Sequence, residues 1–442
     1  MNTRTHAHPW GYALLWLLIA APGFFLFYGQ ANHYASTLPA SAVGNIAFAW
    51  EREWIPFWPW TILPYWSIDL MYGISILICT TRSEIRTQAC RLLLATALSS
   101  LCFVLWPLRF GWDRPEVGGL FGQMFAALGL FDKPFNQAPS LHISLLFIIW
   151  LRAAAHLPAR WLPLLHLWCV LIGLSVLTTW QHHLLDIPTG IAMGVLVCWL
   201  LPVAPVRWQR WHTAAPARAR GLALRYLLGS ASCAMLAGWW QGWGWLLLWP
   251  AAALAVVAFG YAVAGPAVFQ KTGGRLRIAA SWLTAPYRWG AKLVRRYFLN
   301  ALPGAEEVVP GVWLGPITAA REARFAGVLD LTAEYNALAH PAADYRSLPL
   351  LDLLPPTPAE LLHGAQLLEE LRLRHPGQPL LVHCALGMSR SAAIVAAWLI
   401  HYRHVEDAPA ALALLRERRQ RVTLREHHLQ ELASLPARGE QP

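Results

Sequence analysis

Charged residues are scarce in this sequence. Asp, Glu, Lys and Arg make up 13% of its 442 residues, whereas 56% are hydrophobic. Soluble globular domains usually carry about 25% charged residues. The apolar residues fill positions 10–265, and the chain after about residue 300 has the mixed composition of a soluble domain. The shortage of charge therefore excludes an ordinary soluble protein and favours a membrane protein with a soluble C-terminal domain.

Cysteine patterns that mark disulfide frameworks or metal sites are also missing. Six of the seven cysteines lie in or beside apolar segments, and none has CxxC or metal-ligand spacing. Cys384 stands alone in the soluble part and would stay reduced in the cytoplasm. We expect no disulfide, no metal ion and no other cofactor.

Long apolar segments recur along the first part of the chain. A helix that crosses a bilayer needs about 20 mostly apolar residues. The first segment lacks a small-residue cleavage site, so we expect it to be retained rather than removed as a signal peptide. We expect a polytopic helical bundle of eight spans, near residues 10–28, 61–80, 92–108, 141–150, 161–179, 187–202, 223–239 and 245–263.

Arginine is unevenly distributed among the connections between these segments. Arginines follow the second, fourth and sixth segments, whereas the connections after the fifth and seventh contain no Lys or Arg. Because cytoplasmic loops collect Lys and Arg, we expect both termini in the cytoplasm and residues 114–142 and 182–186 on the outer face. The outer face is the periplasm if the membrane is the inner (plasma) membrane of a Gram-negative bacterium. The net charge of +11 then reflects topology, and we expect no nucleic-acid partner.

Residues 271–302 join the two parts and mix basic with aromatic and aliphatic residues. This mixture suits a helix that lies on an anionic membrane surface, with a break at Pro286. A plain basic stop after the last span is the alternative. We therefore expect three regions: a transmembrane domain at 1–270, this linker, and a soluble domain at 303–442.

The soluble part contains the stretch LVHCALGMSRSAA at residues 381–393. It lies between an expected strand and an expected helix, where successive backbone N–H groups converge on one concavity and can bind a phosphate dianion. Gly387 permits the tight backbone, and the guanidinium of Arg390 can hold two phosphate oxygens. The same groups would stabilise Cys384 as a thiolate nucleophile.

A carboxylic acid upstream would complete this site. A phosphocysteine intermediate requires an acid that protonates the leaving alcohol. Asp352 follows an expected strand and precedes a Pro-Pro turn, which makes it the best candidate. Asp344 and Asp330 are nearby alternatives in poorer context.

This set resembles the dual-specificity branch of the protein tyrosine phosphatases, whose signature is HCxxGxxR followed by Ser or Thr. The resemblance covers roughly residues 308–432 and implies an α/β domain. It implies that Cys384 is the nucleophile, Arg390 the phosphate clamp and Asp352 the general acid.

The resemblance also assigns roles to the rest of the loop. His383 would tune the thiolate, Ser391 would help to release phosphate from sulfur, and Gly387 and Ser389 would belong to the phosphate-binding loop. The three remaining loop positions are uncharged, which argues against polyanionic headgroups. Phosphoproteins and simple phospholipid phosphates stay open as substrates.

Ionisable residues near the apolar segments form a second candidate site, because such residues are costly in a membrane and mark function. Arg114 can hold phosphate oxygens, and His182 can attack phosphorus as a neutral imidazole. Asp186, one helical turn on, can accept the other ring N–H and fix the tautomer. His142 can protonate the leaving oxygen. The alternatives are interfacial hydrogen bonds or a His/His/Asp metal site.

These clusters resemble the type 2 phosphatidic acid phosphatase superfamily, whose motifs are KxxxxxxRP, PSGH and SRxxxxxHxxxD. Arg114 matches the end of the first motif, PSLH at 139–142 matches the second, and His182 with Asp186 matches the third. The resemblance spans roughly residues 92–201 and implies a lipid phosphate or pyrophosphate substrate.

The departures from these motifs affect the phosphate-holding positions. Pro107 replaces the Lys of the first motif and Val176 the Arg of the third, which leaves Arg114 and Ser140 to bind phosphate. PSLH and the doubled His182-His183 resemble the inositolphosphorylceramide synthase branch, which transfers a phospho-headgroup between lipids. His183 could replace His182 as nucleophile only with poorer spacing to the aspartate.

The whole chain resembles bacterial fusions of these two phosphatase modules. We expect a membrane-bound phosphatase with two sites whose partners are membrane lipids and lipid phosphates, with phosphoproteins as an open alternative. A headgroup transferase in the membrane half is the second hypothesis. A membrane scaffold or sensor with one inactive module is the third.

Overall fold

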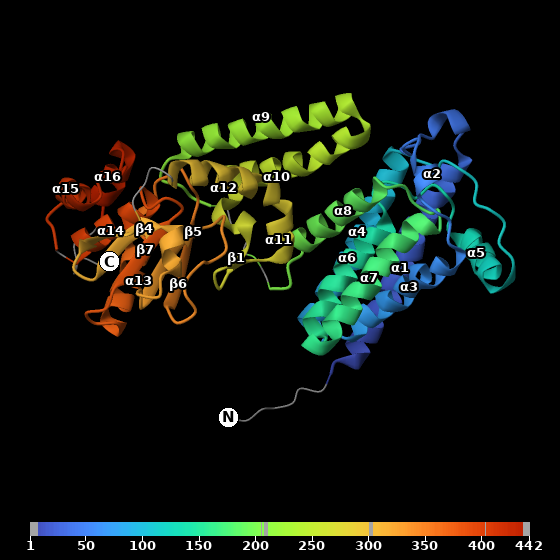
Figure 1. Cartoon of the computed structure of the whole chain (residues 1–442), viewed down its shortest axis with the longest axis horizontal. Helices are drawn as coiled ribbons and strands as arrows, with labels where there is room; N and C mark the ends of the chain where they lie inside the picture. Colours follow the sequence, from blue (N-terminus) through green and yellow to red (C-terminus); the bar gives the residue numbers. More distant parts are fainter. Residues whose placement is uncertain (1–7, 205, 207–210, 300–303, 403, 436–442) are drawn as a thin grey trace. The chain divides into compact units, whose positions relative to one another are not determined.

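The computed structural model describes residues 8–204, 206, 211–299, 304–402 and 404–435. The chain divides into two compact units, Met1–Pro205 and Val206–Pro442. The helices of the first unit are coloured blue to green in Figure 1, and the sheet of the second unit is orange. This division differs from the expected boundary at residue 270. The other expected boundary, at 302/303, lies outside the described residues.

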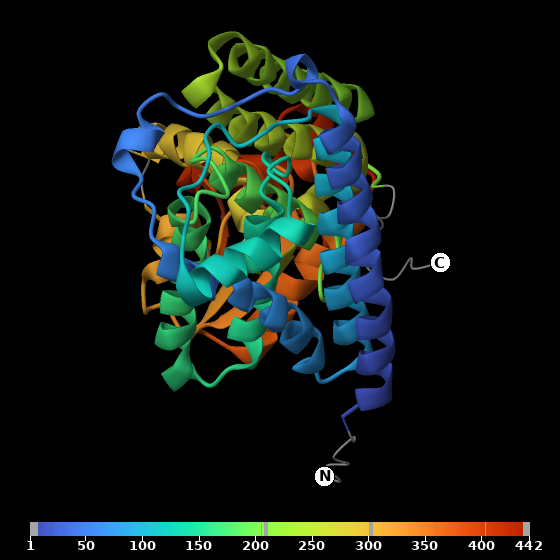
Figure 2. The same cartoon turned by 90° about the vertical axis from the view of Figure 1, so that its right-hand side faces the viewer.

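The first unit is helical throughout. Its helix α1 runs beside α4 (Figure 2), and α6 packs against both α7 and α8. Three short 3-10 helices, η1 to η3, lie in the connections. The bounds are α1 Trp10–Thr37, η1 Ala40–Ala42, α2 Glu51–Trp54, η2 Pro59–Thr61, α3 Ile62–Leu77, α4 Arg82–Leu105, α5 Gly119–Phe131, α6 Leu141–His156, η3 Ala159–Trp161, α7 Leu162–Thr178 and α8 Asp186–Leu200.

Two glycines of α8 allow it to approach α6 closely. A Cβ atom at Gly190 would lie 2.7 Å from the backbone oxygen of Ser140, and one at Gly194 would lie 2.9 Å from that of Ser144. A side chain at either position would therefore push the helices apart. The contact holds the N-terminal ends of α6 and α8 together, which is where the polar motifs lie.

The length of the apolar helices bears on the eight expected spans. Among the described residues, five helical segments are long and apolar enough to cross a membrane: 10–37, 82–105, 159–178, 216–240 and 242–269. Shorter apolar helices occupy 119–131, 141–156 and 186–200. The helix at 119–131 was not expected from the sequence. The expected segment at 141–150 is α6, which continues to His156.

The second unit begins with two apolar helical segments that pack side by side (Figure 1). They correspond to the seventh and eighth expected spans, and they group with the C-terminal part of the chain. The π-helical turn η5 and the 3-10 helix η6 end the second segment. The bounds are α9 Pro216–Trp240, η4 Gly242–Leu247, α10 Leu248–Phe259, η5 Gly260–Ala264 and η6 Gly265–Phe269.

The linker is more structured than the interfacial helix that we expected. It starts with a two-stranded hairpin, β1 Lys271–Thr272 and β2 Arg275–Leu276, followed by α11 Ile278–Leu283 and α12 Ala285–Leu299. The helical break falls at Thr284 rather than at Pro286, because proline is tolerated in the first turn of a helix.

A five-stranded sheet forms the centre of the second unit, in the order β3-β4-β7-β5-β6. Strands β3 and β4 are antiparallel, and the other pairs are parallel. The expected α/β domain is thus confirmed, although the strand expected at 345–353 ends at residue 350. The bounds are β3 Glu306–Val309, β4 Val312–Pro316, η7 Ile317–Arg321, β5 Gly327–Thr332, β6 Asp344–Leu350, α13 Pro358–Arg374, β7 Leu380–Cys384, α14 Arg390–His401, α15 Ala408–Arg418 and α16 Glu426–Ala433.

Both faces of the sheet are covered. Successive side chains alternate between the faces of a strand, so Leu329 and Val382 enter the main core with α13 and α14. Val328 and Leu381 point to the opposite face and pack with Phe325. The central strand β7 is buried along its whole length. Cys384 therefore sits at the carboxyl end of a central parallel strand, where α/β proteins place their sites.

Candidate active sites

The loop between β7 and α14 wraps around the sulfur of Cys384. The backbone N–H of Gly387 points at the Sγ atom from 3.3 Å. Gly387 has a φ of +72°, and a Cβ atom there would lie 2.4 Å from the backbone of Gly315. Only glycine fits both the left-handed conformation and this close approach.

The electrostatics of the loop favour a thiolate at Cys384. Burial by itself raises the pKa of the thiol, but the guanidinium of Arg390 and the hydroxyl and N–H groups of Ser391 outweigh it. The Ser391 hydroxyl lies 3.3 Å from Sγ. The net pKa is below the ordinary cysteine value, so the nucleophilic form is populated at lower pH than in a free thiol.

Arg390 is fully buried and is held in a fixed orientation by Glu334. Its two terminal nitrogens donate to the two carboxylate oxygens at 3.1 and 2.9 Å, and one also donates to the carbonyl of Leu350 at 2.9 Å. The Nε atom is buried without a protein partner. This N–H remains available for an oxygen of a bound phosphate.

Asp352 lies in the turn after β6, as expected from the sequence. Its Oδ1 atom is 3.3 Å from a terminal nitrogen of Arg390, and its side chain is 44% exposed. The alternative acids lie elsewhere. Asp344 pairs with Arg374 at 2.8 Å, and Asp330 is buried and pairs with Lys271 at 2.7 Å. Asp352 is the only one of the three whose carboxylate contacts Arg390 in the described structure.

His383 is buried directly behind the nucleophile. Its Nδ1 atom is 3.4 Å from the carbonyl oxygen of Cys384 and 3.9 Å from the carboxylate of Asp330. Burial is the largest influence and lowers the pKa of His383. His383 thus lies against the backbone of Cys384.

Three residues that sequence reasoning missed support the loop. Glu334 follows β5 and orients Arg390, as described above. Arg419 donates to the carbonyl oxygens of Gly387 at 2.9 Å and Leu386 at 3.3 Å, which keeps those carbonyls turned away from the sulfur. His428 lies 3.1 Å from the hydroxyl of Ser389. All three lie outside the Cys-x5-Arg stretch, and no local spacing points to them.

The first unit brings Ser140, His182 and Asp186 together in one buried chain of hydrogen bonds. The Nδ1 atom of His182 is 3.1 Å from the Asp186 carboxylate, and Nε2 is 3.1 Å from the Ser140 hydroxyl. Asp186 therefore fixes the tautomer that leaves Nε2 as the acceptor. This is the arrangement that a nucleophilic imidazole needs.

His183 has a different set of partners. Its Nε2 atom accepts the backbone N–H of Gly111 at 3.0 Å, so its Nδ1 carries the proton and donates to Glu51 at 3.0 Å. Both side chains are fully buried. His183 ties α2 and the Gly111 segment to the His182 loop, and Glu51 is a residue that the sequence did not single out.

Two further predicted residues have open polar atoms. His142 stacks on the ring of Tyr65 with centroids 4.1 Å apart, and its Nε2 atom is buried without a partner. His142 also has an electrostatic interaction with His182. Arg114 lies over the ring of Phe125 at 4.7 Å, and its buried Nε atom also lacks a partner. Such unpaired groups are costly unless a ligand satisfies them.

Val176, which stands where the third membrane motif has Arg, contacts the histidine of the same motif through its backbone. Val176 is fully buried and offers its backbone carbonyl to the N–H of His182 at 3.0 Å. Near His142, Asp132 accepts hydrogen bonds from Tyr28 and from Tyr65. In the described part of the chain, no group of three or more His, Cys, Asp or Glu side chains could hold a metal ion.

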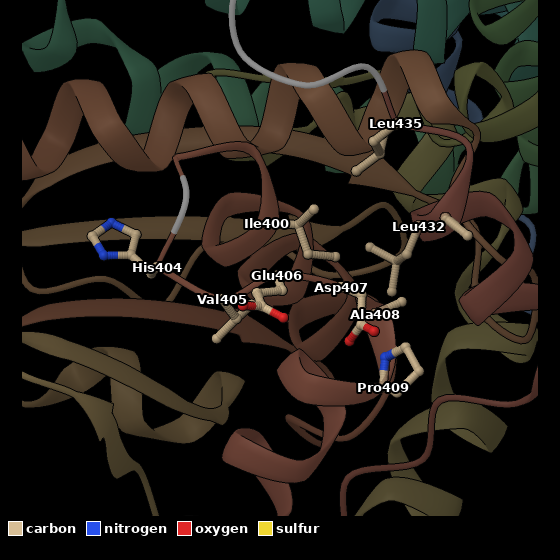
Figure 3. Close-up of a pocket in the computed structure, with 10 residues that line it drawn as sticks. Ile400, His404, Val405, Glu406, Asp407, Ala408, Pro409, Leu432 and Leu435 are labelled. Atoms are coloured by element: carbon tan, nitrogen blue, oxygen red, sulfur yellow. The ribbon is translucent and has the colours of Figure 1, made fainter.

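A surface hollow of about 770 Å³ lies on the second unit between the α14–α15 connection and α16 (Figure 3). Its lining includes Ile400, Asp407 and Leu432 but neither Cys384 nor Arg390. The Asp407 carboxylate already caps α15 by accepting the N–H of Ala410 at 2.8 Å. The hollow is therefore separate from the Cys384 site.

Two parts of the chain are similar to known protein families. Residues 88–210 match the family model "PAP2 superfamily", and residues 321–436 match "Dual specificity phosphatase, catalytic domain". Mouse dual specificity protein phosphatase 26 is 35% identical over 118 residues, which cover 23% of this chain and 53% of that protein. The chain thus spans about half the length of this relative.

Solved structures are similar to about 30% of the chain. The active form of Tk-PTP is 25% identical, covering 30% of this chain and 96% of that one, with a TM-score of 0.27. PTPMT1 is 25% identical, covering 29% and 91%, with a TM-score of 0.26. One part of the chain is thus similar to the PAP2 superfamily and another part to the catalytic domain of dual specificity phosphatases.

Proposed function

We propose that the chain is a membrane-bound phosphatase with two separate phosphoryl-transfer sites. The observation that carries the proposal is the loop around Cys384, where a thiol of lowered pKa, a clamped arginine and an aspartate meet. The second site is the hydrogen-bonded chain through His182. Both sites suit phosphate esters, and the two family matches agree with this chemistry.

At the first site, the Cys384 thiolate attacks phosphorus and forms an S–P bond while the P–O bond of the ester breaks. Asp352 gives its proton to the leaving oxygen, and the Nε–H of Arg390 donates to a non-bridging oxygen. Water then attacks the phosphocysteine. Asp352 accepts a proton from this water, and the Ser391 hydroxyl donates to the departing sulfur. Phosphate is released, and the Cys384 thiolate is regenerated.

A membrane-bound phosphomonoester is the favoured substrate of the Cys384 site. Helix α12 exposes Trp289, Leu293 and Tyr297 at 57%, 68% and 76%, and Lys292 and Arg296 are also exposed. Apolar and basic side chains on one exposed surface suit an anionic membrane face. This argues for a phospholipid phosphate ahead of a phosphoprotein.

At the second site, His182 Nε2 attacks phosphorus and forms a phosphohistidine, while Asp186 stabilises the positive charge on the ring. His142 in its protonated form would protonate the leaving oxygen, and Arg114 would hold the phosphate. Water then releases the phosphate. If a lipid alcohol replaced this water, the same intermediate would make the membrane half a headgroup transferase. The PSLH sequence and the doubled histidine favour that second function.

The location follows from the arginine distribution. We place the chain in the bacterial inner membrane, with both termini and the Cys384 domain in the cytoplasm and the His182 site facing outward. The count of eight spans belongs to this proposal. A reporter enzyme fused to the C-terminus and active outside the cytoplasm would contradict it.

The decisive experiment is phosphate release by the full chain in detergent micelles. Wild type, Cys384→Ser and His182→Ala are assayed on a panel of lipid phosphates, a lipid pyrophosphate and an aryl phosphate. We expect each variant to lose a separate set of substrates. If Cys384→Ser retains full activity on the aryl phosphate, the first site is wrongly assigned. If His182→Ala retains all activity on lipid phosphates, the second site is wrongly assigned.

A further inference from the structure

The turn that carries Asp352 is held by residues from the apolar helices at the start of the second unit. The hydroxyl of Tyr261 donates to the carbonyl oxygen of Asp352 at 2.9 Å. The Nε atom of Arg218 donates to the carbonyl oxygen of Leu353 at 2.6 Å. Arg218 lies in the first turns of α9, and Tyr261 lies in η5, directly after α10. The two contacts thus come from both segments of the α9–α10 pair.

Tyr261 is itself fixed in place. It is 2% exposed and stacks on Tyr226 of α9 with ring centroids 5.5 Å apart and planes 18° apart. Tyr287 of α12 contacts Tyr226 edge-on at 5.7 Å. A buried phenol needs a partner for its hydroxyl, and the described partner of Tyr261 is the Asp352 carbonyl.

The turn needs such support. Leu353 has a φ of +62°, a backbone conformation that residues other than glycine rarely adopt. Its side chain is 49% exposed, so packing does not fix the backbone. The Asp352 carboxylate is also half exposed and has one described ion-pair contact, to Arg390. The two carbonyl contacts therefore restrain the backbone of the turn that carries the carboxyl group.

We propose that the α9–α10 pair positions the general acid of the Cys384 site, with Tyr261 and Arg218 as positioning residues. The inference rests on the proposed function of Cys384 and Asp352. In the first chemical step, Asp352 transfers its proton to the ester oxygen as the P–O bond breaks and the S–P bond forms. If the turn relaxes, this proton is delivered poorly while the thiolate and Arg390 stay in place.

This role predicts a dependence on the leaving group that loss of folding would not produce. An alkyl phosphate releases a strongly basic alkoxide and needs the acid. An aryl phosphate with an acidic phenol leaves as a stable anion and does not. General acid catalysis contributes about 10²–10⁴-fold, so a misplaced acid costs part of that factor on alkyl esters only.

The test uses the full chain with His182→Ala as the parent, so that the second proposed site cannot hydrolyse the lipid, and every comparison with wild type is made against this parent. The substrates, in detergent micelles, are a short-chain phosphatidic acid and p-nitrophenyl phosphate. For Tyr261→Phe we expect kcat on the alkyl ester to fall by about 10-fold and kcat on the aryl ester to stay within about 2-fold of wild type. Arg218→Gln should show the same pattern more weakly. Asp352→Asn sets the full effect, about 100-fold on the alkyl ester.

Two controls separate the contact from general packing. Tyr287→Phe removes a hydroxyl from the same cluster, and Arg220→Gln removes an exposed arginine from the same helix. Both should match wild type on both substrates. Equal losses on the two substrates in Tyr261→Phe, or the same selective loss in Tyr287→Phe, would overturn the inference. If Tyr261→Phe does not fold, Arg218→Gln replaces it as the test. The inference is then overturned if Arg218→Gln shows no selective loss on the alkyl ester.

The same panel tells a failure of the inference from a failure of the proposed function. Full aryl phosphatase activity in Cys384→Ser would remove the nucleophile, and the inference with it. An Asp352→Asn variant without leaving-group selectivity would remove the acid assignment. An inactive Cys384→Ser and a selective Asp352→Asn, together with wild-type behaviour of Tyr261→Phe and Arg218→Gln, would refute the positioning role alone.

Discussion

The guanidinium of Arg390 and the carboxylate of Glu334 form a buried two-point ion pair, with N···O distances of 3.1 and 2.9 Å. The pair fixes the plane of the guanidinium while leaving Nε free of protein partners. A phosphate that enters the loop therefore meets an arginine that is already oriented. Less of the binding free energy is then spent on ordering the side chain.

Replacing Glu334 by Gln should weaken phosphate binding at the Cys384 site. Hydrogen bonds to charged groups contribute about 1.5–3 kcal/mol, so we expect kcat/KM on an aryl phosphate to fall by roughly 10-fold or more, mainly through KM. Inhibition by vanadate should weaken in parallel. Glu369→Gln, which removes the partner of Arg372 on α13, is the control. Unchanged vanadate inhibition in Glu334→Gln would contradict the orienting role.

The thiol of Cys384 should titrate below the ordinary cysteine pKa. Because the thiolate is the reactive form, the rate of iodoacetamide modification should rise with pH and reach its midpoint at lower pH than in a model thiol. Ser391→Ala removes a hydrogen bond that lowers the pKa, so its midpoint should move to higher pH. The Cys384→Ser chain supplies the background from the other cysteines. A midpoint that Ser391→Ala leaves in place would argue against the described contact.

Substitutions of the neighbouring residues His182 and His183 should affect catalysis and stability differently. His183→Ala leaves the buried Glu51 carboxylate and the Gly111 N–H without their partner, which costs about 1–3 kcal/mol per unsatisfied group. His182→Ala removes the nucleophile but not this three-way contact. We expect thermal unfolding in detergent to show the larger loss of stability in His183→Ala. Turnover of the lipid phosphates that Cys384→Ser still hydrolyses should be abolished in His182→Ala. The reverse pattern would mean that His183 is the nucleophile.

The ion pair of Lys271 with Asp330 should stabilise the second unit. Both side chains are buried, and removing one partner of a buried pair costs about 3–5 kcal/mol. Lys271→Met should therefore lower the free energy of unfolding in urea by about this amount. Lys292→Met, on the exposed surface of α12, should change it little. An equal effect of the two substitutions would contradict the buried pair.

This ion pair also sets a dependence on pH. Burial raises the pKa of Asp330, but His383 and Lys271 outweigh it and the net pKa is lowered. A carboxyl group with a lowered pKa stabilises the fold above its unfolded pKa of about 4. This contribution is lost as the pH falls through the folded value. Lys271→Met should therefore flatten the acid limb of the stability curve.

The sequence located the reacting groups better than the groups that hold them. Cys384, Gly387 and Arg390 lie within one loop, so their spacing alone predicted the phosphate cradle. Glu334 and Arg419 reach the same loop from other strands and helices. Their positions near the loop depend on how the sheet folds. No periodic pattern in the sequence predicts these positions.

The unit boundary was also beyond prediction from hydropathy. The segments 216–240 and 242–269 are as apolar as the earlier helices, so composition grouped them with the membrane half. Their described partners instead include the turn at Asp352 and helix α12. Hydropathy reports which solvent a helix prefers, and it does not report which polar groups the ends of that helix contact.

The grouping of α9 and α10 with the C-terminal unit determines where the gene can be divided. A fragment that starts near residue 303 would leave Asp330 without Lys271 and the turn at Asp352 without Tyr261 and Arg218. A fragment that starts near residue 206 keeps all of these contacts. The portable module of this protein therefore includes the two apolar helices α9 and α10.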